Sequence, residues 1–180
     1  MSLPNLISIG RLCSAPVIVW LIVTGQLNLA FWVFLLASIS DGVDGYVAKR
    51  FNRTTVLGGY LDPIADKTLL VSVYITLGQA GYLDLWLVIL VVFRDLLIVG
   101  GALLFRMLSN SLTMQPLLIS KVNTVAQIVL AAIMLAQLGL GLPVEALATI
   151  AIYVVAASTL LSGASYITQW SRRAVGLESS

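Results

Sequence analysis

Long apolar stretches follow one another along almost the whole chain and limit the folds open to it. Of the 180 residues, 59% are hydrophobic and only 10% are charged, whereas a soluble domain carries about 25% charged residues. The apolar stretches are about 20 residues long, the length at which a helix crosses roughly 30 Å of hydrocarbon. The sequence therefore predicts an all-α, polytopic membrane protein. In this prediction residues 1–180 form a single membrane domain, with no room for a soluble one.

Hydropathy and helix-breaking residues divide the chain into six predicted transmembrane helices, arranged as a six-helix bundle. The predicted spans cover residues 4–24, 29–50, 58–78, 85–105, 116–138 and 143–170. No basic segment precedes the first apolar stretch and no small-residue cleavage site follows it, so we expect a retained helix rather than a cleaved signal peptide. The start also lacks the composition of a transit peptide, which favours a bacterial inner membrane over an organelle.

Basic residues are distributed unevenly among the predicted connections. The first, third and fifth connections contain none. The second connection, the borders of the fourth and the segment after the last span contain Lys49, Arg50, Arg53, Arg106, Lys121, Arg172 and Arg173. Because cytoplasmic loops of membrane proteins are enriched in basic residues, this asymmetry predicts that both termini face the cytoplasm.

The residue types that are scarce exclude several classes of function. The chain has no histidine, which excludes histidine metal sites, histidine proton relays and Ser-His triads. Its single cysteine, Cys13, excludes an internal disulfide. We expect no nucleic-acid partner.

Four of the eight acidic residues lie between positions 41 and 66: Asp41, Asp44, Asp62 and Asp66. One carboxylate deep in a membrane helix costs about 2.5–3.5 kcal/mol, so four of them without a compensating cation would cost roughly 10 kcal/mol. Spacings of three and four residues place the members of each pair on one helical face. Because the connection 49–57 is short, we expect two antiparallel neighbouring helices whose aspartates share one pocket just inside the cytoplasmic leaflet.

A pocket of four carboxylates suits a hard cation such as Mg²⁺, Mn²⁺ or Ca²⁺. Four exceed what one Mg²⁺ usually takes from protein, so the pattern predicts two ions, which together can clamp a phosphoryl group in an in-line displacement. Gly45 and the pair Gly58-Gly59 lack side chains beside the acids, so a phosphate could approach the backbone closely. Close helix packing is the alternative explanation for Gly45 and Ala48.

The spacing of these residues resembles the signature of the CDP-alcohol phosphatidyltransferases, D-x2-D-G-x2-A-R-x8-G-x3-D-x3-D. The matching positions are Asp41, Asp44, Gly45, Ala48, Lys49, Gly58, Asp62 and Asp66. Lys49 stands where the family has arginine, which keeps a cation but loses bidentate phosphate geometry; Arg50 could substitute after a small helix adjustment. The resemblance extends over the whole chain, because six helices with cytoplasmic termini are also the family's architecture.

The resemblance implies a metal-dependent enzyme and a homodimer. In members of this family, an acceptor hydroxyl attacks the β-phosphorus of a CDP-linked lipid, and CMP is released. Carried over by position, Asp41, Asp44 and Asp62 are ligands of Mg²⁺ or Mn²⁺, and Asp66 is the general base that also touches the second ion. The residues expected to bind the CDP-lipid are Asn5, Ser8, Arg11, Gly45, Ala48, Lys49 and Gly58. For Arg11, anchoring at the membrane surface is the alternative.

Two segments outside the signature, 94–98 and 116–124, resemble transferase-type cardiolipin synthases, which implies phosphatidylglycerol as the acceptor. Asn123 stands where related phosphatidylglycerophosphate synthases tend to have a second lysine, which a dianionic acceptor such as glycerol 3-phosphate would favour; such a synthase is the alternative function. The predicted acceptor-binding residues are Arg94, Ser120, Lys121 and Asn123. A divalent-cation transporter would explain acidic residues in the membrane, but not their clustering at one end.

Several polar residues of the later spans have two possible interpretations. Ser120, Asn123, Thr124 and Gln127 form a helical stripe that either contacts the acceptor headgroup or makes interhelical hydrogen bonds. Arg94 and Asp95 leave their helix about 100° apart, so we do not expect them to face each other squarely. Asp95 is predicted either to contact substrate or to belong to a buried network, and Lys67 to balance local negative charge. The small residues Ser158, Ser162, Gly163 and Ser165 predict close packing or a subunit contact.

Overall fold

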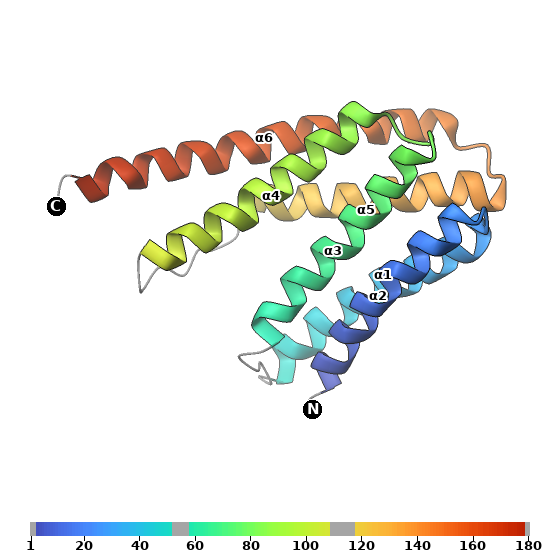
Figure 1. The fold of residues 1–180 in the computed structure, drawn as a ribbon, viewed down its shortest axis with the longest axis horizontal. Helices are drawn as coiled ribbons and strands as arrows, with labels where there is room; N and C mark the ends of the chain where they lie inside the picture. The colour runs from blue at the N-terminus through green and yellow to red at the C-terminus, as the bar shows by residue number, and fades with distance from the viewer. Residues whose placement is uncertain (1–2, 52–57, 109–117, 179–180) are drawn as a thin grey trace.

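The computed structural model describes residues 3–51, 58–108 and 118–178, with side chains over 9–40, 67–101 and 118–168. These residues form six helices and no strand (Figure 1), which confirms the predicted all-α class. The helices are α1 (Leu3–Val23), α2 (Leu27–Phe51), α3 (Gly58–Gln79), α4 (Leu85–Leu108), α5 (Leu118–Leu140) and α6 (Glu145–Glu178). The last helix continues beyond the predicted limit of residue 170.

Three short turns join the helices in pairs and gather at one end of the molecule (Figure 1). Each turn contains a glycine with a positive φ: 74° at Gly25, 77° at Gly81 and 66° at Gly141. Residues with a Cβ rarely adopt this left-handed conformation, so glycine ends each helix with little strain. At Gly25 the next amide, that of Gln26, donates to the carbonyl of Leu21 at 2.8 Å. We call this end the turn end and the opposite one the open end.

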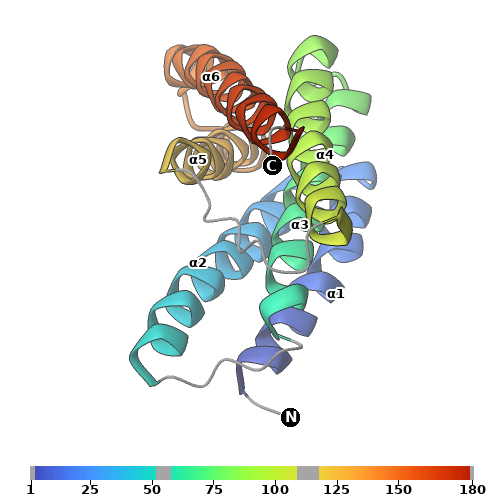
Figure 2. The same cartoon turned by 90° about the vertical axis from the view of Figure 1, so that its left-hand side faces the viewer.

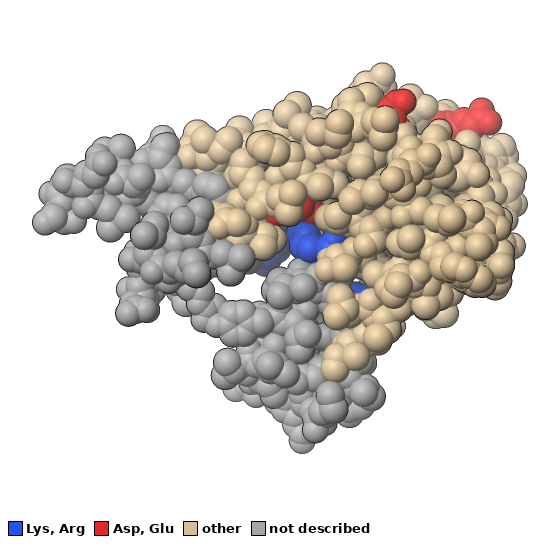
Figure 3. Space-filling model, in the orientation of Figure 1, with Lys and Arg blue, Asp and Glu red and all other residues tan. Residues whose placement is uncertain are grey.

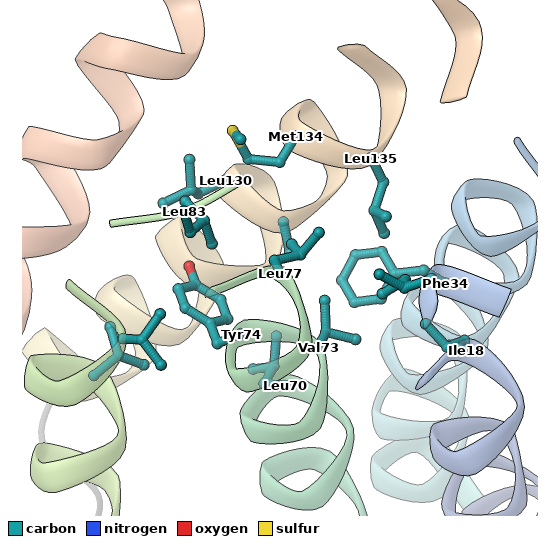
Figure 4. Close-up of a cluster of buried hydrophobic side chains, with 14 of the residues drawn as sticks. Ile18, Phe34, Leu70, Val73, Tyr74, Leu77, Leu83, Leu130, Met134 and Leu135 are labelled. Atoms are coloured by element: carbon teal, nitrogen blue, oxygen red, sulfur yellow. The ribbon is translucent and has the colours of Figure 1, made fainter. Parts of the chain in front are cut away.

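The helices pack most tightly where α3 meets its neighbours. Fully buried side chains from four helices meet there: Ile18 of α1, Phe34 of α2, Val73 and Leu77 of α3, and Leu130 of α5 (Figure 4). Gly139 lets α5 approach α2 so closely that a Cβ at this position would lie 2.5 Å from the carbonyl oxygen of Leu27. Dispersion contacts of this kind, rather than expulsion of water, hold helices together in an apolar solvent.

Large apolar side chains also cover much of the outside. Trp20, Leu36, Ile89, Phe93 and Val122 are all exposed. An apolar surface this extensive is unusual for a soluble monomer and typical of a protein that lies against lipid or another apolar partner.

Two of the helices are long and apolar enough, over their described residues, to cross a membrane: Leu118–Leu140 and Glu145–Thr168. Two shorter apolar helices, Ile9–Val23 and Leu27–Ser40, lie within α1 and α2. The prediction of six helices is thus confirmed, whereas the prediction that all six cross the membrane stays a prediction.

Candidate active site

The predicted metal-binding aspartates lie on two helices, as the sequence indicated. Asp41 and Asp44 belong to the second half of α2, and Asp62 and Asp66 to the first turns of α3. All four lie outside the residues with described side chains, as do Asn5, Ser8, Gly45, Ala48, Lys49 and Gly58. Among the described side chains, no three His, Cys, Asp or Glu residues lie together as metal ligands would. The donor set of four carboxylates fits Mg²⁺ or Mn²⁺, and the metal site stays a prediction.

The helices that carry the aspartates are not the simple pair of neighbours that the short connection suggested. α1 packs against both α2 and α3, and α5 also contacts both of them. Over the residues that the structure describes, direct packing between α2 and α3 is slight at most. In Figure 2 the two helices diverge toward the open end. α1 and α5 therefore set the relative position of the two aspartate pairs.

The described side chain richest in polar contacts is Arg94 on α4, which is only 3% exposed. Its Nη2 donates to Ser120 Oγ of α5 at 2.7 Å and also to Ser162 Oγ of α6, which its Nε reaches at 3.2 Å. Its Nη1 donates to Asp95 Oδ1 at 2.7 Å. Arg94 thus ties α4 to α5 and α6 through its own hydrogen bonds.

The contact between Arg94 and Asp95 contradicts our expectation for adjacent residues. The two side chains leave α4 in different directions, but the long arginine side chain turns back to reach its neighbour at 2.7 Å. The close-packing interpretation of the small residues on α6 was also too narrow. Ser162 is buried and receives two hydrogen bonds from Arg94, so this part of the stripe is a polar contact between helices.

Asp95 extends the network to α3. Its Oδ1 also accepts a hydrogen bond from Lys67 Nζ at 2.8 Å. Asp95 is buried, whereas the side chain of Lys67 keeps 22% of its surface exposed. Sequence reasoning expected Lys67 to balance negative charge but did not find Asp95 as its partner. The available signal was a lysine in α3 and a carboxylate in the middle of an apolar α4, both of which need a partner.

Asn123 forms a second polar contact, between α5 and α6. It is 0% exposed, and its Oδ1 accepts hydrogen bonds from Ser158 Oγ at 2.7 Å and Thr159 Oγ1 at 2.9 Å. Gln127, one turn further, accepts a hydrogen bond from Tyr74 of α3 at 3.0 Å through its backbone carbonyl. The interhelical interpretation therefore holds for Asn123, and its predicted contact with the acceptor stays a prediction.

The basic side chains of the described residues are Arg11, Lys67, Arg94 and Lys121. Figure 3 shows basic side chains, with acidic ones among them, gathered at a hollow in the molecule. Arg11 is 5% exposed, so it lies inside the bundle and not at the lipid-facing surface where a membrane anchor would be. Lys121 is exposed on α5, one residue after the partner of Arg94 on that helix. Basic and acidic side chains therefore lie together in this part of the molecule.

Comparison with known proteins defines the class of the chain. Residues 1–163 match the family model of the CDP-alcohol phosphatidyltransferases. The chain belongs to this family, whose members are enzymes that transfer phosphatidyl groups.

Among its relatives are proteins of two named activities. The chloroplastic CDP-diacylglycerol–glycerol-3-phosphate 3-phosphatidyltransferase 1 of rice is 40% identical over 92% of this chain and 56% of its own length. The CMP-forming cardiolipin synthase of Homo sapiens is 33% identical over 75% of this chain and 50% of its own length. The CDP-diacylglycerol–glycerol-3-phosphate 3-phosphatidyltransferase of Bacillus subtilis is 28% identical over 93% of this chain and 94% of its own length. The chain thus spans about half the length of the first two relatives.

Proposed function

We propose that the protein is a cardiolipin synthase that transfers the phosphatidyl group of CDP-diacylglycerol to a hydroxyl of phosphatidylglycerol and releases CMP. It would be an integral membrane protein with six spans and with both termini and the active site on the cytoplasmic side, in a bacterial inner membrane. The family resemblance adds a homodimer to the proposal. The observation that carries the choice of acceptor is the burial of Asn123, at the position where the alternative synthases tend to have a lysine.

Different residues of the chain would have different roles in this reaction. Asp66 would accept the proton of the acceptor hydroxyl. The hydroxyl oxygen then forms a bond to the β-phosphorus, while the bond from that phosphorus to the oxygen shared with the α-phosphate breaks and CMP leaves. Asp41, Asp44, Asp62 and Asp66 would hold divalent ions, which when bound supply positive charge against the diphosphate.

Charge at the start of α5 supports a lipid acceptor. Asn123 has no exposed surface, and both hydrogen bonds to its Oδ1 come from α6. A lysine at this position would place its ammonium group in a buried contact between two helices, which is costly without a partner charge. The described part of α5 therefore offers one cation, the exposed Lys121. One positive charge matches the single negative charge of a phosphodiester better than the two charges of glycerol 3-phosphate.

The alternative function is the synthesis of phosphatidylglycerophosphate from glycerol 3-phosphate. It is favoured by the rice relative, whose 40% identity over 92% of this chain exceeds the 33% identity of the human cardiolipin synthase. The two activities consume the same CDP-lipid and differ only in the acceptor.

Product analysis distinguishes the two. The purified protein is incubated with CDP-diacylglycerol and Mg²⁺, together with either phosphatidylglycerol or glycerol 3-phosphate, and the lipid product is identified by mass spectrometry. We expect cardiolipin as the main product and no CMP release with either acceptor in excess chelator. Phosphatidylglycerophosphate as the main product would reverse the choice of acceptor, and full turnover in chelator would contradict the metal requirement.

A further inference from the structure

Three charged side chains meet inside the open half of the bundle, and their charges do not cancel. Lys67 and Arg94 both donate to the same atom, Asp95 Oδ1, at 2.8 and 2.7 Å. Counted over these three side chains alone, two cations on one carboxylate leave one net positive charge. Arg94 and Asp95 are buried, where unbalanced charge is costly and a further partner of opposite sign would be favourable. The charge of this cluster would therefore favour binding of an anion. The anion would bind to whichever of the two cations is accessible.

Lys67 is the accessible one. The guanidinium of Arg94 is 3% exposed and donates to Asp95, Ser120 and Ser162, so few of its donors remain for a ligand. The ammonium of Lys67 has three N–H donors. One of them is engaged by Asp95, and 22% of the lysine side chain is exposed. A ligand at this cluster would therefore meet Lys67 rather than Arg94.

The position of Lys67 in the sequence matches the geometry of an acceptor. Lys67 directly follows Asp66, the proposed general base, in the same helix. In phosphatidylglycerol, three carbons of glycerol separate the reacting hydroxyl from the phosphodiester, and the same three carbons separate hydroxyl and phosphate in glycerol 3-phosphate. A base that receives the hydroxyl proton and a cation that holds the phosphate must therefore be near neighbours.

We infer that Lys67 binds the phosphate group of the acceptor, and that Asp95, held by Arg94, positions the Lys67 ammonium for this contact. The inference rests on the proposed phosphatidyl transfer but not on which of the two acceptors is used. Asp95 acts as a positioning residue, because its contacts are to Arg94 and Lys67 and it is itself buried.

A purely structural salt bridge predicts a different set of effects. If Lys67 is replaced by methionine, Asp95 keeps its contact with Arg94 at 2.7 Å, so no buried carboxylate is left without a cation. We therefore expect Lys67→Met to fold. A structural role would change the melting temperature alone, whereas acceptor binding would change the dependence of the rate on the acceptor.

The test compares variants of the full chain in lipid nanodiscs by steady-state CMP release, with CDP-diacylglycerol and each acceptor varied in turn. For Lys67→Met we expect the KM of the acceptor to rise roughly 10- to 100-fold, as for the loss of one charged hydrogen bond, with little change in the KM of CDP-diacylglycerol. Lys67→Arg should restore most of the affinity, and Asp95→Asn should give an intermediate rise. Asp84→Asn is the matched control, because Asp84 is exposed at the turn end and asparagine caps the start of α4 equally well.

A neutral acceptor identifies the group that Lys67 contacts. Phosphatidylglycerol whose phosphate is methylated to an uncharged triester should be a poorer acceptor for the wild type, and Lys67→Met should hardly distinguish it from the natural lipid. The inference would be overturned if Lys67→Met preferred the charged acceptor over the neutral one as strongly as the wild type does. It would also be overturned if Lys67→Met raised only the KM of CDP-diacylglycerol.

The same measurements separate the inference from the proposed function. If the wild type prefers glycerol 3-phosphate, the choice of acceptor is wrong. The role of Lys67 is then tested by comparing the KM of glycerol 3-phosphate between the wild type and Lys67→Met. If the wild type releases no CMP with either acceptor, equilibrium binding of radiolabelled phosphatidylglycerol and glycerol 3-phosphate to wild type and Lys67→Met decides the inference: equal binding contradicts it. Lys67→Arg and Asp95→Asn supply the comparison if Lys67→Met does not fold.

Discussion

The two ends of the bundle are held together by different kinds of contact. At the turn end, helices are joined by short glycine turns and held by apolar contacts such as that between Gly139 and the backbone of Leu27. Toward the open end, Arg94, Asp95 and Lys67 link α4, α5, α6 and α3 through charged hydrogen bonds. Figures 1 and 2 show the helices close together at the turns and spread apart at the other end.

This difference indicates which half of the fold is available for catalysis. Apolar packing is insensitive to charge and closes one end of the bundle tightly. Polar contacts cost desolvation and persist only where their partners are placed well, so their concentration in the other half indicates a role that packing cannot fill. If this division is correct, changes toward the open end should affect activity first, and changes at the turn end should affect stability alone.

The largest effect is expected from Asp66→Asn. The amide cannot accept a proton as a carboxylate does, so the rate of CMP release should fall by roughly 10²- to 10⁴-fold, the range for removing a general base. Binding of CDP-diacylglycerol, measured at equilibrium with a radiolabelled lipid, should stay detectable. Asp84→Asn, the same change at the turn end, should leave the rate unaltered; a near wild-type rate in Asp66→Asn would remove Asp66 from its proposed role.

Arg94→Met tests whether the polar network is as important to the open half as packing is to the turn end. The substitution removes hydrogen bonds to Asp95, Ser120 and Ser162 while keeping an unbranched side chain. Because Lys67 still neutralises Asp95, we expect a loss of about 2–4 kcal/mol, less than for a buried carboxylate left without any cation. Thermal unfolding in detergent measures it, and Lys67→Met should be destabilised less. An unchanged melting temperature would contradict the interhelical role of Arg94.

The elements of the fold could be predicted from the sequence, because each depends on local properties. Apolar stretches separated by helix-breaking residues predicted six helices, and most of their predicted ends lie close to the observed ones. The spacing of the four aspartates predicted the family, which the match over residues 1–163 confirms. The spacing of residues along the chain is a property of the sequence itself, so the family could be predicted without the tertiary structure.

Contacts between helices could not be predicted in the same way. The pairing of Lys67 with Asp95 depends on how α3 and α4 are rotated about their axes, and helical periodicity gives the face of a residue but not its neighbour. For the same reason the short connection after α2 suggested that α2 and α3 pack side by side, whereas α1 contacts both of them. From backbone directions alone we did not expect Arg94 and Asp95 to face each other squarely, although the arginine side chain is long enough to reach its neighbour.

The smallest effect concerns the turn end and is confined to stability. In Gly139→Ala the new Cβ would lie 2.5 Å from the carbonyl oxygen and 2.8 Å from the Asn28 amide nitrogen of α2. Both neighbours are backbone atoms that cannot rotate away, so α5 and α2 must separate, at a cost of about 1–3 kcal/mol.

Gly100→Ala is the matched control for this change, because a Cβ at that position of α4 meets no atom within 4 Å. Alanine also favours a helix over glycine, by up to about 1 kcal/mol, so this control should be neutral or slightly stabilised in thermal unfolding. The KM of both substrates should stay the same in the two variants. A change in acceptor KM for Gly139→Ala would show that the turn end is coupled to the site, and that the division between a packed end and a chemical end is too sharp.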